Sequence, residues 1–148
     1  MPGNRTLAII KPDAVAGGML GAILAHVERE GFRIRGARLD RLSRIEAETF
    51  YEIHRGRPFY EELVTFMSSG PSMPVALERA DAVAAFRATI GATDPAEAAP
   101  GTIRKLFAES KGRNAVHGSD SDETAVREIA FFFPERALAG LWGDTQPR

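Results

Sequence analysis

The chain has 148 residues, of which 44% are hydrophobic and 26% charged, and these proportions are typical of a folded domain rather than a disordered chain. Its formal net charge of −1 provides no overall positive field, so nucleic acid is not expected as a partner and a bound anion must be held by local cations. The absence of cysteine excludes disulfides, thiolate metal sites and cysteine catalysis. We therefore expect one domain over residues 1–148.

The first apolar run of the chain is short. It extends from Thr6 to Ile10, contains β-branched residues, and ends at Lys11-Pro12-Asp13. Such a run predicts a buried strand. It is too short for the core of a signal peptide or for a membrane span, so we expect no membrane association and a cytoplasmic location.

A helix and an irregular strand are predicted to follow. Apolar residues recur at helical spacing between Leu20 and Val27, and Gly31 supplies a stop signal. Residues 32–42 alternate only in part, with a change of parity near Gly36. This pattern predicts a strand with a bulge at that glycine.

Two helices are expected before residue 70. Glu46 follows Ser43 at the spacing of a capping box, which marks a helix start. This helix is predicted to carry a stripe of side chains on one face, namely Ile45, Thr49, Phe50 and Ile53. Apolar residues between Leu63 and Met67 predict a second short helix, which Gly70-Pro71 closes.

The second half of the chain again alternates strand and helix. Residues 74–77 predict a strand, and Asp81 is a candidate cap for a helix that ends at Ile90 before Gly91. The segment from Gly91 to Gly101 is rich in glycine, proline and alanine, and a long excursion in so small a domain predicts a functional loop.

A fourth strand is expected to reach Val116, and Ser121 or Asp120 is expected to cap a last helix. The apolar side chains of that helix are Ala125, Val126 and Ile129. The resulting order is β-α-β-α-α-β-α-β-α, and strands separated by helices predict an α/β sandwich with helices packed on one sheet.

Three histidines are candidates for chemistry. His26 is expected to be a surface or boundary histidine without a chemical role, on the first long helix. His54 lies at a predicted helix end beside two arginines, where it could interact with backbone carbonyls or contact a phosphate. Residue type and position leave both readings of His54 open.

His117 is the strongest of the three. It follows an apolar pair and precedes a glycine and a polar turn that opens a helix, so its imidazole is expected at a strand end. A neutral imidazole can act as a nucleophile near pH 7 when a second group orients its ring, and Ser119 and Glu128 are candidates for that group. The alternative is a histidine that only caps a turn.

Three cations stand near polar loops, namely Lys11, Arg87 and Arg104. Arginine forks and a lysine point charge suit a polyphosphate, although each cation taken alone is more simply a solvated surface group. The sequence has no zinc-ligand spacing, no Gly-x-x-x-x-Gly-Lys-Ser/Thr loop and no Gly-x-Ser-x-Gly elbow. These absences disfavour a zinc site, a P-loop kinase and a serine hydrolase.

Several motifs in sequence order resemble those of the nucleoside diphosphate kinase family. They are RTLAIIKPDAV (5–15), FYEIHRGRPFYEELV (50–64), FMSSGP (66–71), RATIGATDPAEAAPGTIR (87–104), NAVHGSDS (114–121) and EIAFFF (128–133). The resemblance implies a ferredoxin-like βαββαβ fold, a four-stranded antiparallel sheet with added helices. It also implies a ping-pong reaction in which a nucleoside triphosphate, mainly ATP, phosphorylates His117 and the phosphohistidine then phosphorylates a nucleoside diphosphate.

The resemblance further implies a role for each matched residue. Catalytic roles fall to His117, Lys11, Tyr51, Glu128 and Ser119. The nucleotide-binding positions are Lys11, His54, Phe59, Leu63, Arg87, Thr93, Arg104 and Asn114. Within this set Phe59 stacks on the base beside Leu63, Asn114 and Lys11 lie near the sugar hydroxyls, and the remaining members surround the phosphates.

Mg²⁺ is the implied cofactor, bound by phosphate oxygens rather than directly by the protein, with Asp120 able to reach it through water. The implied assembly is a homo-oligomer, with a hexamer preferred over a tetramer. Lys111 departs from the small apolar residue that many relatives place against the base, although a lysine stem can still cover a ring. The tail from Gly140 to Arg148 has no counterpart in the motifs.

Two other functions compete with the enzyme. A regulatory module that kept the fold without turnover would usually lack the histidine or a phosphate-binding cation, and this chain has both. A nucleic-acid binder is disfavoured by the near-neutral charge.

Overall fold

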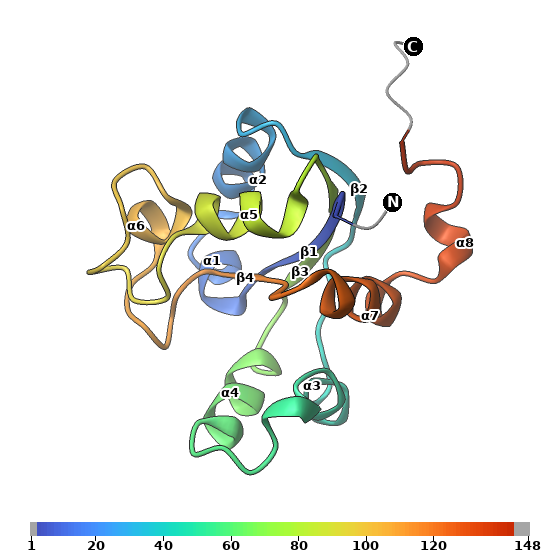
Figure 1. Cartoon of the computed structure of the whole chain (residues 1–148). Coiled ribbons are helices and arrows are strands. Elements are labelled where there is room, and N and C mark those ends of the chain that lie inside the picture. The colour runs from blue at the N-terminus through green and yellow to red at the C-terminus, as the bar shows by residue number, and fades with distance from the viewer. Residues whose placement is uncertain (1–2, 144–148) are drawn as a thin grey trace.

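A four-stranded antiparallel sheet forms the centre of the computed structural model, which describes residues 3–143 (Figure 1). Its strands are β1 (Arg5–Ile10), β2 (Arg33–Ala37), β3 (Met73–Glu78) and β4 (Val116–Gly118). Their order across the sheet is β2-β3-β1-β4, and each neighbouring pair is antiparallel. The sheet and its added helices confirm the ferredoxin-like prediction.

Helices connect the strands and extend beyond them. They are α1 (Pro12–Ala16), α2 (Leu20–Arg29), α3 (Arg44–Phe50), the 3₁₀ helix η1 (Glu52–His54), α4 (Tyr60–Met67), α5 (Ala82–Ile90), α6 (Ile103–Phe107), α7 (Asp122–Phe132) and α8 (Glu135–Leu138). None of the helices within residues 3–143 is long and apolar enough to cross a membrane.

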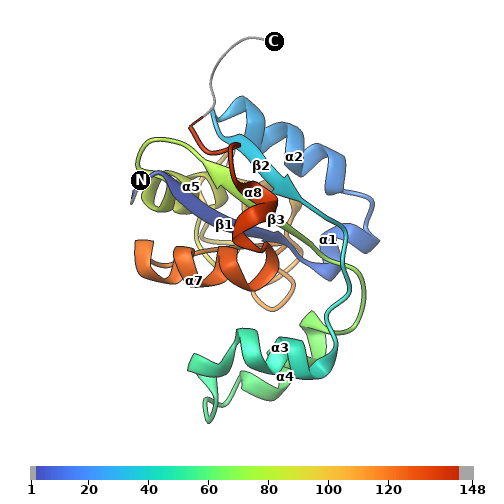
Figure 2. The ribbon, with the colours of Figure 1, turned by 90° about the vertical axis from the view of Figure 1, so that its right-hand side faces the viewer.

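Both faces of the sheet are buried, because alternate residues of β1 point to opposite sides. Leu7 and Ile9 pack into one apolar cluster with residues of α3, α4 and α7. Ala8 and Ile10 pack into a second cluster with residues of α2, α5 and α6. Figure 2 shows α2 and α5 on one side of the sheet and α7 on the other, with the α3–α4 hairpin below.

Several local predictions are confirmed. The register between β2 and β3 shifts between Ile34 and Gly36, which is the expected bulge. Ser43 and Glu46 form the complete capping box of α3. Ser121 caps α7, and its partner three positions on is Thr124, whose side chain accepts from the Ser121 N–H.

Other helix predictions are wrong in detail. The stripe on α3 does not face the core as a whole, since Ile45 and Ile53 are each 74% exposed and only Phe50 of the apolar set is buried. The helix ends at Phe50 and the chain turns into η1, so Ile53 leaves the helical register. The last helix does carry Ala125, Val126 and Ile129, of which Val126 is 67% exposed and the other two are buried.

Asp81 occupies the N-cap position of α5 but does not cap it. Its backbone adopts a left-handed conformation with φ of 54°, and its side chain makes no capping hydrogen bond. The predicted C-terminal signal is correct, because Gly91 follows the last residue of α5 with φ of 86°. A glycine suits that conformation because it has no Cβ.

The strand predictions also need correction. β2 ends at Ala37 instead of continuing to Leu42, with only an isolated bridge between Asp40 and Ser72 beyond it. β4 begins at Val116, where the predicted strand was expected to end, so His117 lies in the middle of a strand rather than at its end. The short helices α1, α6 and α8 were not predicted, because five residues or fewer show no helical period.

Candidate active site

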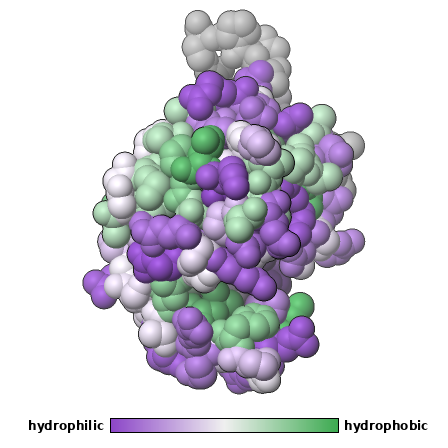
Figure 3. Space-filling view, turned by 90° about the vertical axis from the view of Figure 1, so that its left-hand side faces the viewer, coloured by the Kyte–Doolittle hydropathy of each residue, from purple (hydrophilic) through white to green (hydrophobic). Residues whose placement is uncertain are grey.

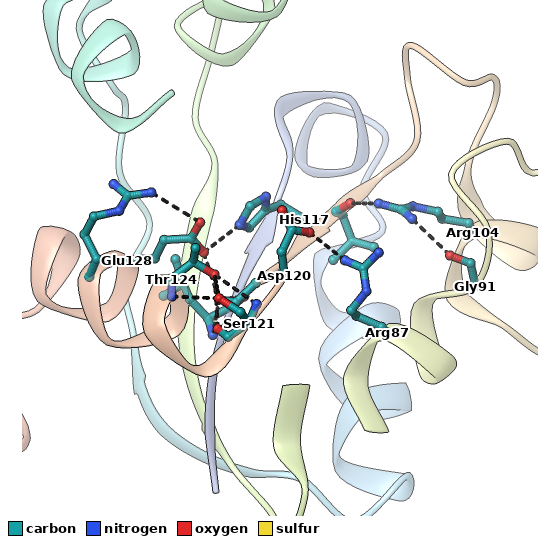
Figure 4. Close-up of polar contacts among 12 residues, drawn as sticks. Arg87, Gly91, Arg104, His117, Asp120, Ser121, Thr124 and Glu128 are labelled. Atoms are coloured by element: carbon teal, nitrogen blue, oxygen red, sulfur yellow. Dashed lines mark hydrogen bonds and ion pairs between the residues drawn. The ribbon is translucent and has the colours of Figure 1, made fainter. Parts of the chain in front are cut away.

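The geometry around His117 joins a strand to a helix. His117 pairs with Ile9 of β1, so its side chain points to the face of the sheet that α7 covers. There the Nε2 atom of His117 lies 2.9 Å from Oε1 of Glu128, and the hydroxyl of Ser119 donates to the same oxygen at 2.8 Å. Figure 4 shows His117 between Glu128 on one side and two arginines on the other.

Glu128 is a buried carboxylate with polar partners. Its side chain is 8% exposed. Burial alone would raise its pKa, but hydrogen bonds and charge interactions from His117, the hydroxyl of Ser119 and the cation of Arg127 together lower the pKa of Glu128 below its ordinary value. Glu128 is therefore an anion at neutral pH, which fixes Nε2 of His117 as the proton-bearing nitrogen whenever the ring is neutral.

The hydrogen-bond network also ties this pair to the sheet. The backbone N–H of Leu7 donates to Oγ of Ser119 at 3.2 Å, and Ser119 is fully buried. An added Cβ at Gly118 would lie 2.9 Å from the ring of Phe86, so only glycine allows β4 to approach α5 this closely. The glycine beside His117 therefore has a packing role.

Aromatic rings line the other side of His117. Phe50 is buried and meets the imidazole edge-on at a centroid separation of 5.6 Å. Tyr51 lies 6.3 Å from the ring of His117 and the same distance from His54, which in turn lies 5.3 Å from Phe59. This row of rings runs from the partly buried His117 to Phe59, which is 45% exposed.

Tyr51 carries a buried hydroxyl that has no hydrogen-bond partner within the described residues. Burial first, and the charge of Glu128 second, raise the pKa of Tyr51, so the hydroxyl keeps its proton. It is a hydrogen-bond donor available to a group that enters the site.

Lys11 follows β1 and is 8% exposed. Its Nζ donates to Oδ1 of Asn114 at 2.9 Å. Burial and the nearby Arg104 lower the pKa of Lys11 to about 8, and Asp13 acts in the opposite direction. Lys11 is thus a cation at neutral pH with little water around it, which strengthens its attraction for an anion.

Arg104 is anchored to the backbone at two points. Its guanidinium donates to the carbonyl of Gly91 at 3.0 Å and to that of Val116 at 2.8 Å. Burial and the charge of Arg87 lower the pKa of Arg104 to about 10, so it remains cationic at neutral pH. Its bond to Val116 places this charge beside the strand that carries His117.

Arg87 and Asp120 form an exposed ion pair at 2.8 Å, next to His117 (Figure 4). The side chains are 53% and 75% exposed, so the pair is weak and either member can exchange its partner for a ligand. Arg87 and Arg104 lie close enough for their charges to interact. A local cluster of cations therefore exists despite the neutral overall charge.

The loop after α5 shapes this edge of the site. Thr102 caps α6 by accepting the Lys105 N–H, and an added Cβ at Gly91 would lie 2.6 Å from its hydroxyl oxygen. Close contact with Gly91 thus holds the start of α6, and with it Arg104, against the end of α5. Thr93 is exposed in the same loop, and among residues 3–143 no hydrogen bond ties its side chain to the cluster.

Figure 3 shows the face formed by the loop around α6 and by α4, hollowed between the body of the molecule and the hairpin, with apolar residues along part of the hollow. Leu63, on α4, is partly buried against the first apolar cluster. Arg113 lies over the ring of Phe66 on α4 at 5.7 Å, so the loop that carries the exposed Lys111 reaches across to this helix.

His26 lies apart from this cluster. It is 8% exposed on α2, so the expectation of a surface or boundary histidine is wrong. Two residues near His117 were missed by sequence reasoning. Phe50 was predicted only as a helix side chain, and Asp13, which accepts the Ala115 N–H at 3.0 Å, carried no signal beyond its place in the first motif.

No cluster of three or more histidine or acidic side chains suited to a metal ion occurs among residues 3–143. Asp120 is an exposed carboxylate at the edge of the cation cluster, and carboxylate oxygen suits Mg²⁺. A magnesium ion that enters with a polyphosphate therefore fits these residues, whereas a site built by the protein alone does not.

Comparisons with known proteins match this geometry to one family. The family model described as nucleoside diphosphate kinase matches residues 4–138. A nucleoside diphosphate kinase of Chlorobium luteolum is 59% identical over 130 residues, covering 88% of this chain and 93% of the relative. The corresponding protein of Sorangium cellulosum is 60% identical over 130 residues, covering 88% and 90%.

A solved structure agrees with the sequence matches. The orthorhombic crystal form of the Aquifex aeolicus nucleoside diphosphate kinase superposes with a TM-score of 0.89 at 47% identity, covering 91% of this chain and 98% of that one. Identity at this level over nearly the whole length, together with the family model and the fold, shows that the chain belongs to the nucleoside diphosphate kinase family and is a phosphotransferase.

Proposed function

We propose that His117 carries the phosphoryl group in the nucleoside diphosphate kinase reaction and that its Nδ1 atom is the nucleophile. The observation that supports this most strongly is the contact between Nε2 of His117 and the buried carboxylate of Glu128. With the proton held on Nε2, the lone pair of the neutral ring lies on Nδ1. A buried anion beside the ring also stabilises the positive charge that develops there during attack.

The reaction then proceeds in two symmetrical halves. Nδ1 attacks the γ-phosphorus of a nucleoside triphosphate, a P–N bond forms, and the bond to the bridging oxygen breaks to release the nucleoside diphosphate. A second nucleoside diphosphate binds the same site, and its terminal oxygen takes the phosphoryl group from Nδ1. One set of charges serves both halves, since positioning and electrostatic stabilisation supply most of the catalysis of phosphoryl transfer.

The phosphate-binding roles follow from charge and donor geometry. Lys11 brings a partly desolvated cation, and the hydroxyl of Tyr51 is a free donor near the imidazole. Arg104 is held on two carbonyls, while Arg87 can leave Asp120 for a phosphate. His54 and Thr93 complete the proposed phosphate contacts.

The nucleoside is proposed to bind at the exposed end of the row of rings. Phe59 is half exposed and can stack on a base with Leu63 beside it. Asn114 and Lys11, already bonded to each other, are proposed to reach the sugar hydroxyls. Stacking accepts any π-face, so broad use of different nucleotides is expected. Lys111 is proposed to cover the base from the opposite loop.

Three further proposals follow from the family resemblance. Mg²⁺ is the proposed cofactor. It would neutralise the charge of the bound phosphates, and Asp120 would reach it through water. The chain is proposed to form a homohexamer, with a tetramer as the second choice. A cytoplasmic location is proposed with these.

A coupled assay tests the function. Wild-type protein, incubated with GTP, ADP and Mg²⁺, is expected to form ATP, which a luciferase reaction detects. The His117→Ala variant, with an unchanged circular dichroism spectrum, is expected to form none. Equal ATP formation by the variant would remove His117 from the mechanism. The matched control is His26→Ala, which removes a histidine outside the cluster.

A further inference from the structure

The residue that leads into the nucleophile strand has an unusual backbone. Ala115 has φ of 74°, a left-handed value that residues other than glycine rarely adopt. The N–H of Val116 donates to the carbonyl of Asn114 at 2.9 Å, which closes a three-residue turn around Ala115. A γ-turn with positive φ at its centre is the rare and strained form. Such a turn persists only where the surroundings hold it in place.

The segment that follows β1 holds this turn from both sides. The N–H of Ala115 donates to Oδ2 of Asp13 at 3.0 Å, and its carbonyl accepts from the N–H of Lys11 at 2.9 Å. Asp13 is 7% exposed and Ala115 is fully buried, so water does not compete for either bond. Both polar groups of the strained residue are therefore bonded to the chain between residues 11 and 13.

The turn positions functional side chains at both of its ends. Asn114, its first residue, accepts from Nζ of Lys11. Val116, its last residue, accepts from Arg104 and directly precedes His117. A relaxation of Ala115 to negative φ would rotate these side chains relative to one another. Fixing this turn therefore fixes the distance from nucleophile to cations.

A helix-capping role does not account for Asp13. Although Asp13 lies in the first turn of α1, that helix has no side-chain capping bond, and Oδ2 instead bonds a residue 102 positions away in sequence. Oδ1 of Asp13 is buried without a hydrogen-bond partner within residues 3–143. A buried carboxylate that gives up part of its hydration for a single distant N–H indicates selection for position or charge.

We propose that Asp13 is a positioning residue for phosphoryl transfer, which clamps the strained turn at Ala115 and thereby sets His117 and Asn114 against Lys11. This proposal rests on the proposed role of His117. The clamp acts through the Ala115 N–H. The charge of the same carboxylate also faces two cations, Lys11 and Arg113, and supports the cationic form of Lys11 against the charge of Arg104.

The test measures the rate at which γ-labelled ATP phosphorylates His117, with a melting curve for every variant. Asp13→Ala is expected to slow labelling about 100-fold, the scale of an ångström-sized misplacement. The double variant Asp13→Ala/Ala115→Gly is expected to label about tenfold faster than Asp13→Ala, because glycine adopts positive φ without the bond from Asp13. Ala115→Gly alone and the exposed control Asp81→Asn are expected to label like the wild type.

Asp13→Asn separates the clamp from the charge. Its amide oxygen can still accept from Ala115, so its loss of rate at pH 7 is expected to be smaller than that of Asp13→Ala. The negative charge of Asp13, which raises the pKa of Lys11, is absent from this variant. The alkaline limb of the pH–rate profile for labelling is therefore expected to move to lower pH. A purely structural role would leave that limb in place.

The outcomes are distinguishable. A folded Asp13→Ala variant that labels at the wild-type rate, or a slow one that glycine at position 115 does not rescue, overturns the proposal. If Asp13→Ala does not fold, a wild-type rate and pH profile for Asp13→Asn overturn it equally. Absence of label on the wild-type protein would contradict the role of His117 itself, which is a separate failure.

Discussion

At the scale of single residues, the site depends on a few buried charges of opposite sign. Glu128 holds one nitrogen of His117, while Lys11 and Arg104 bring positive charge to the part of the site proposed to bind phosphate. Each of these groups has lost much of its water, so its interactions are stronger than those of surface charges. The same burial makes their protonation states measurable through pH.

Glu128 is expected to give stability a specific pH dependence. Its pKa in the folded protein lies below the ordinary value of 4.5, so its contribution is fully present above that pH and is lost as pH falls through the lower folded value. Chemical denaturation at a series of acidic pH values measures this loss. The Glu128→Gln variant is expected to lose less stability over the same window.

The matched control for Glu128 is Glu123→Gln, an exposed carboxylate in the first turn of the same helix. It is expected to retain the wild-type dependence. If Glu128→Gln and wild-type protein lost stability in parallel below pH 4.5, the pKa of Glu128 would not be lowered in the folded protein.

Lys11 is expected to set the alkaline limit of activity. Its pKa of about 8 means that the cation loses its proton above that pH, and transfer should slow as it does. Lys11→Arg is expected to move the alkaline limb of the pH–rate profile upward, since an arginine stays charged, while lowering the rate at pH 7 because the fork fits the site of an ammonium poorly. Lys105→Arg, on the exposed side of α6, is the control.

The same lowered pKa affects stability with a definite sign. A folded pKa of about 8 lies below the unfolded value of 10.5, so the folded state releases its proton first and stability should rise with pH between those values. Two results together would show that Lys11 keeps its ordinary pKa. They are a wild-type pH–rate profile without an alkaline limb and a free energy of unfolding that stays constant between pH 8 and 10.5.

At the scale of elements, the stability of helix α7 affects the geometry of the site, because α7 carries Glu128 and begins just after β4, which carries His117. Its capping box satisfies backbone groups that would otherwise lack partners at the helix start. Ser121→Ala is expected to lower the free energy of unfolding by about 1 kcal/mol, as is Ser43→Ala at the box of α3. Urea denaturation measures both.

Only the α7 variant is expected to slow phosphoryl transfer, since Glu128 moves with α7 whereas α3 contributes Phe50 from its far end. Equal effects of the two capping variants on the rate would show that general stability, rather than the placement of α7, limits the reaction.

Elements with strong local signals were predictable from the sequence. The capping box of α3, the cap of α7 at Ser121, the bulge at Gly36 and the end of α5 at Gly91 each depend on the chemistry of neighbouring residues. The exposure of Ile45 and Ile53 was not predictable, because the helix ends earlier than its apolar pattern does. β4 is defined by pairing with β1 and not by its own three residues, so its position depends on tertiary contacts.

The candidate site was predictable to a different extent. The resemblance supplied the residues, and the fold brings His117, Glu128, Lys11 and Arg104 to one region. The sequence alone could not show which nitrogen of His117 contacts Glu128, nor that Asp13 bonds the turn at Ala115. The second contact joins residues 102 positions apart. Position 115 is an alanine rather than a glycine, so the residue type there does not mark its left-handed backbone.

At the scale of the whole molecule, the last residues that the structure describes lie against the start of the sheet. Trp142 lies under the guanidinium of Arg5 at 4.2 Å, and the N–H of Gly143 donates to Glu78 at 2.8 Å. Part of the predicted tail is thus packed on the domain, while residues 144–148 lie outside the described part of the chain.

The proposed assembly makes a prediction about mass. Sedimentation equilibrium of the purified chain is expected to give about six times the subunit mass of 16.1 kDa. A value four times the subunit mass would support the tetramer instead, and a monomer would contradict both. Labelling rates compared above and below the dissociation concentration would show whether one subunit is sufficient for the reaction.

The most direct test of the account concerns the nitrogen that takes the phosphate. Protein labelled with ¹⁵N-histidine is incubated with ATP and Mg²⁺, separated from nucleotide, and observed by ¹⁵N and ³¹P NMR under alkaline conditions. We expect one acid-labile, alkali-stable phosphoryl group per chain, on Nδ1 of His117 and absent from His117→Ala. A phosphoryl group on Nε2, or on any residue of the His117→Ala protein, would contradict it.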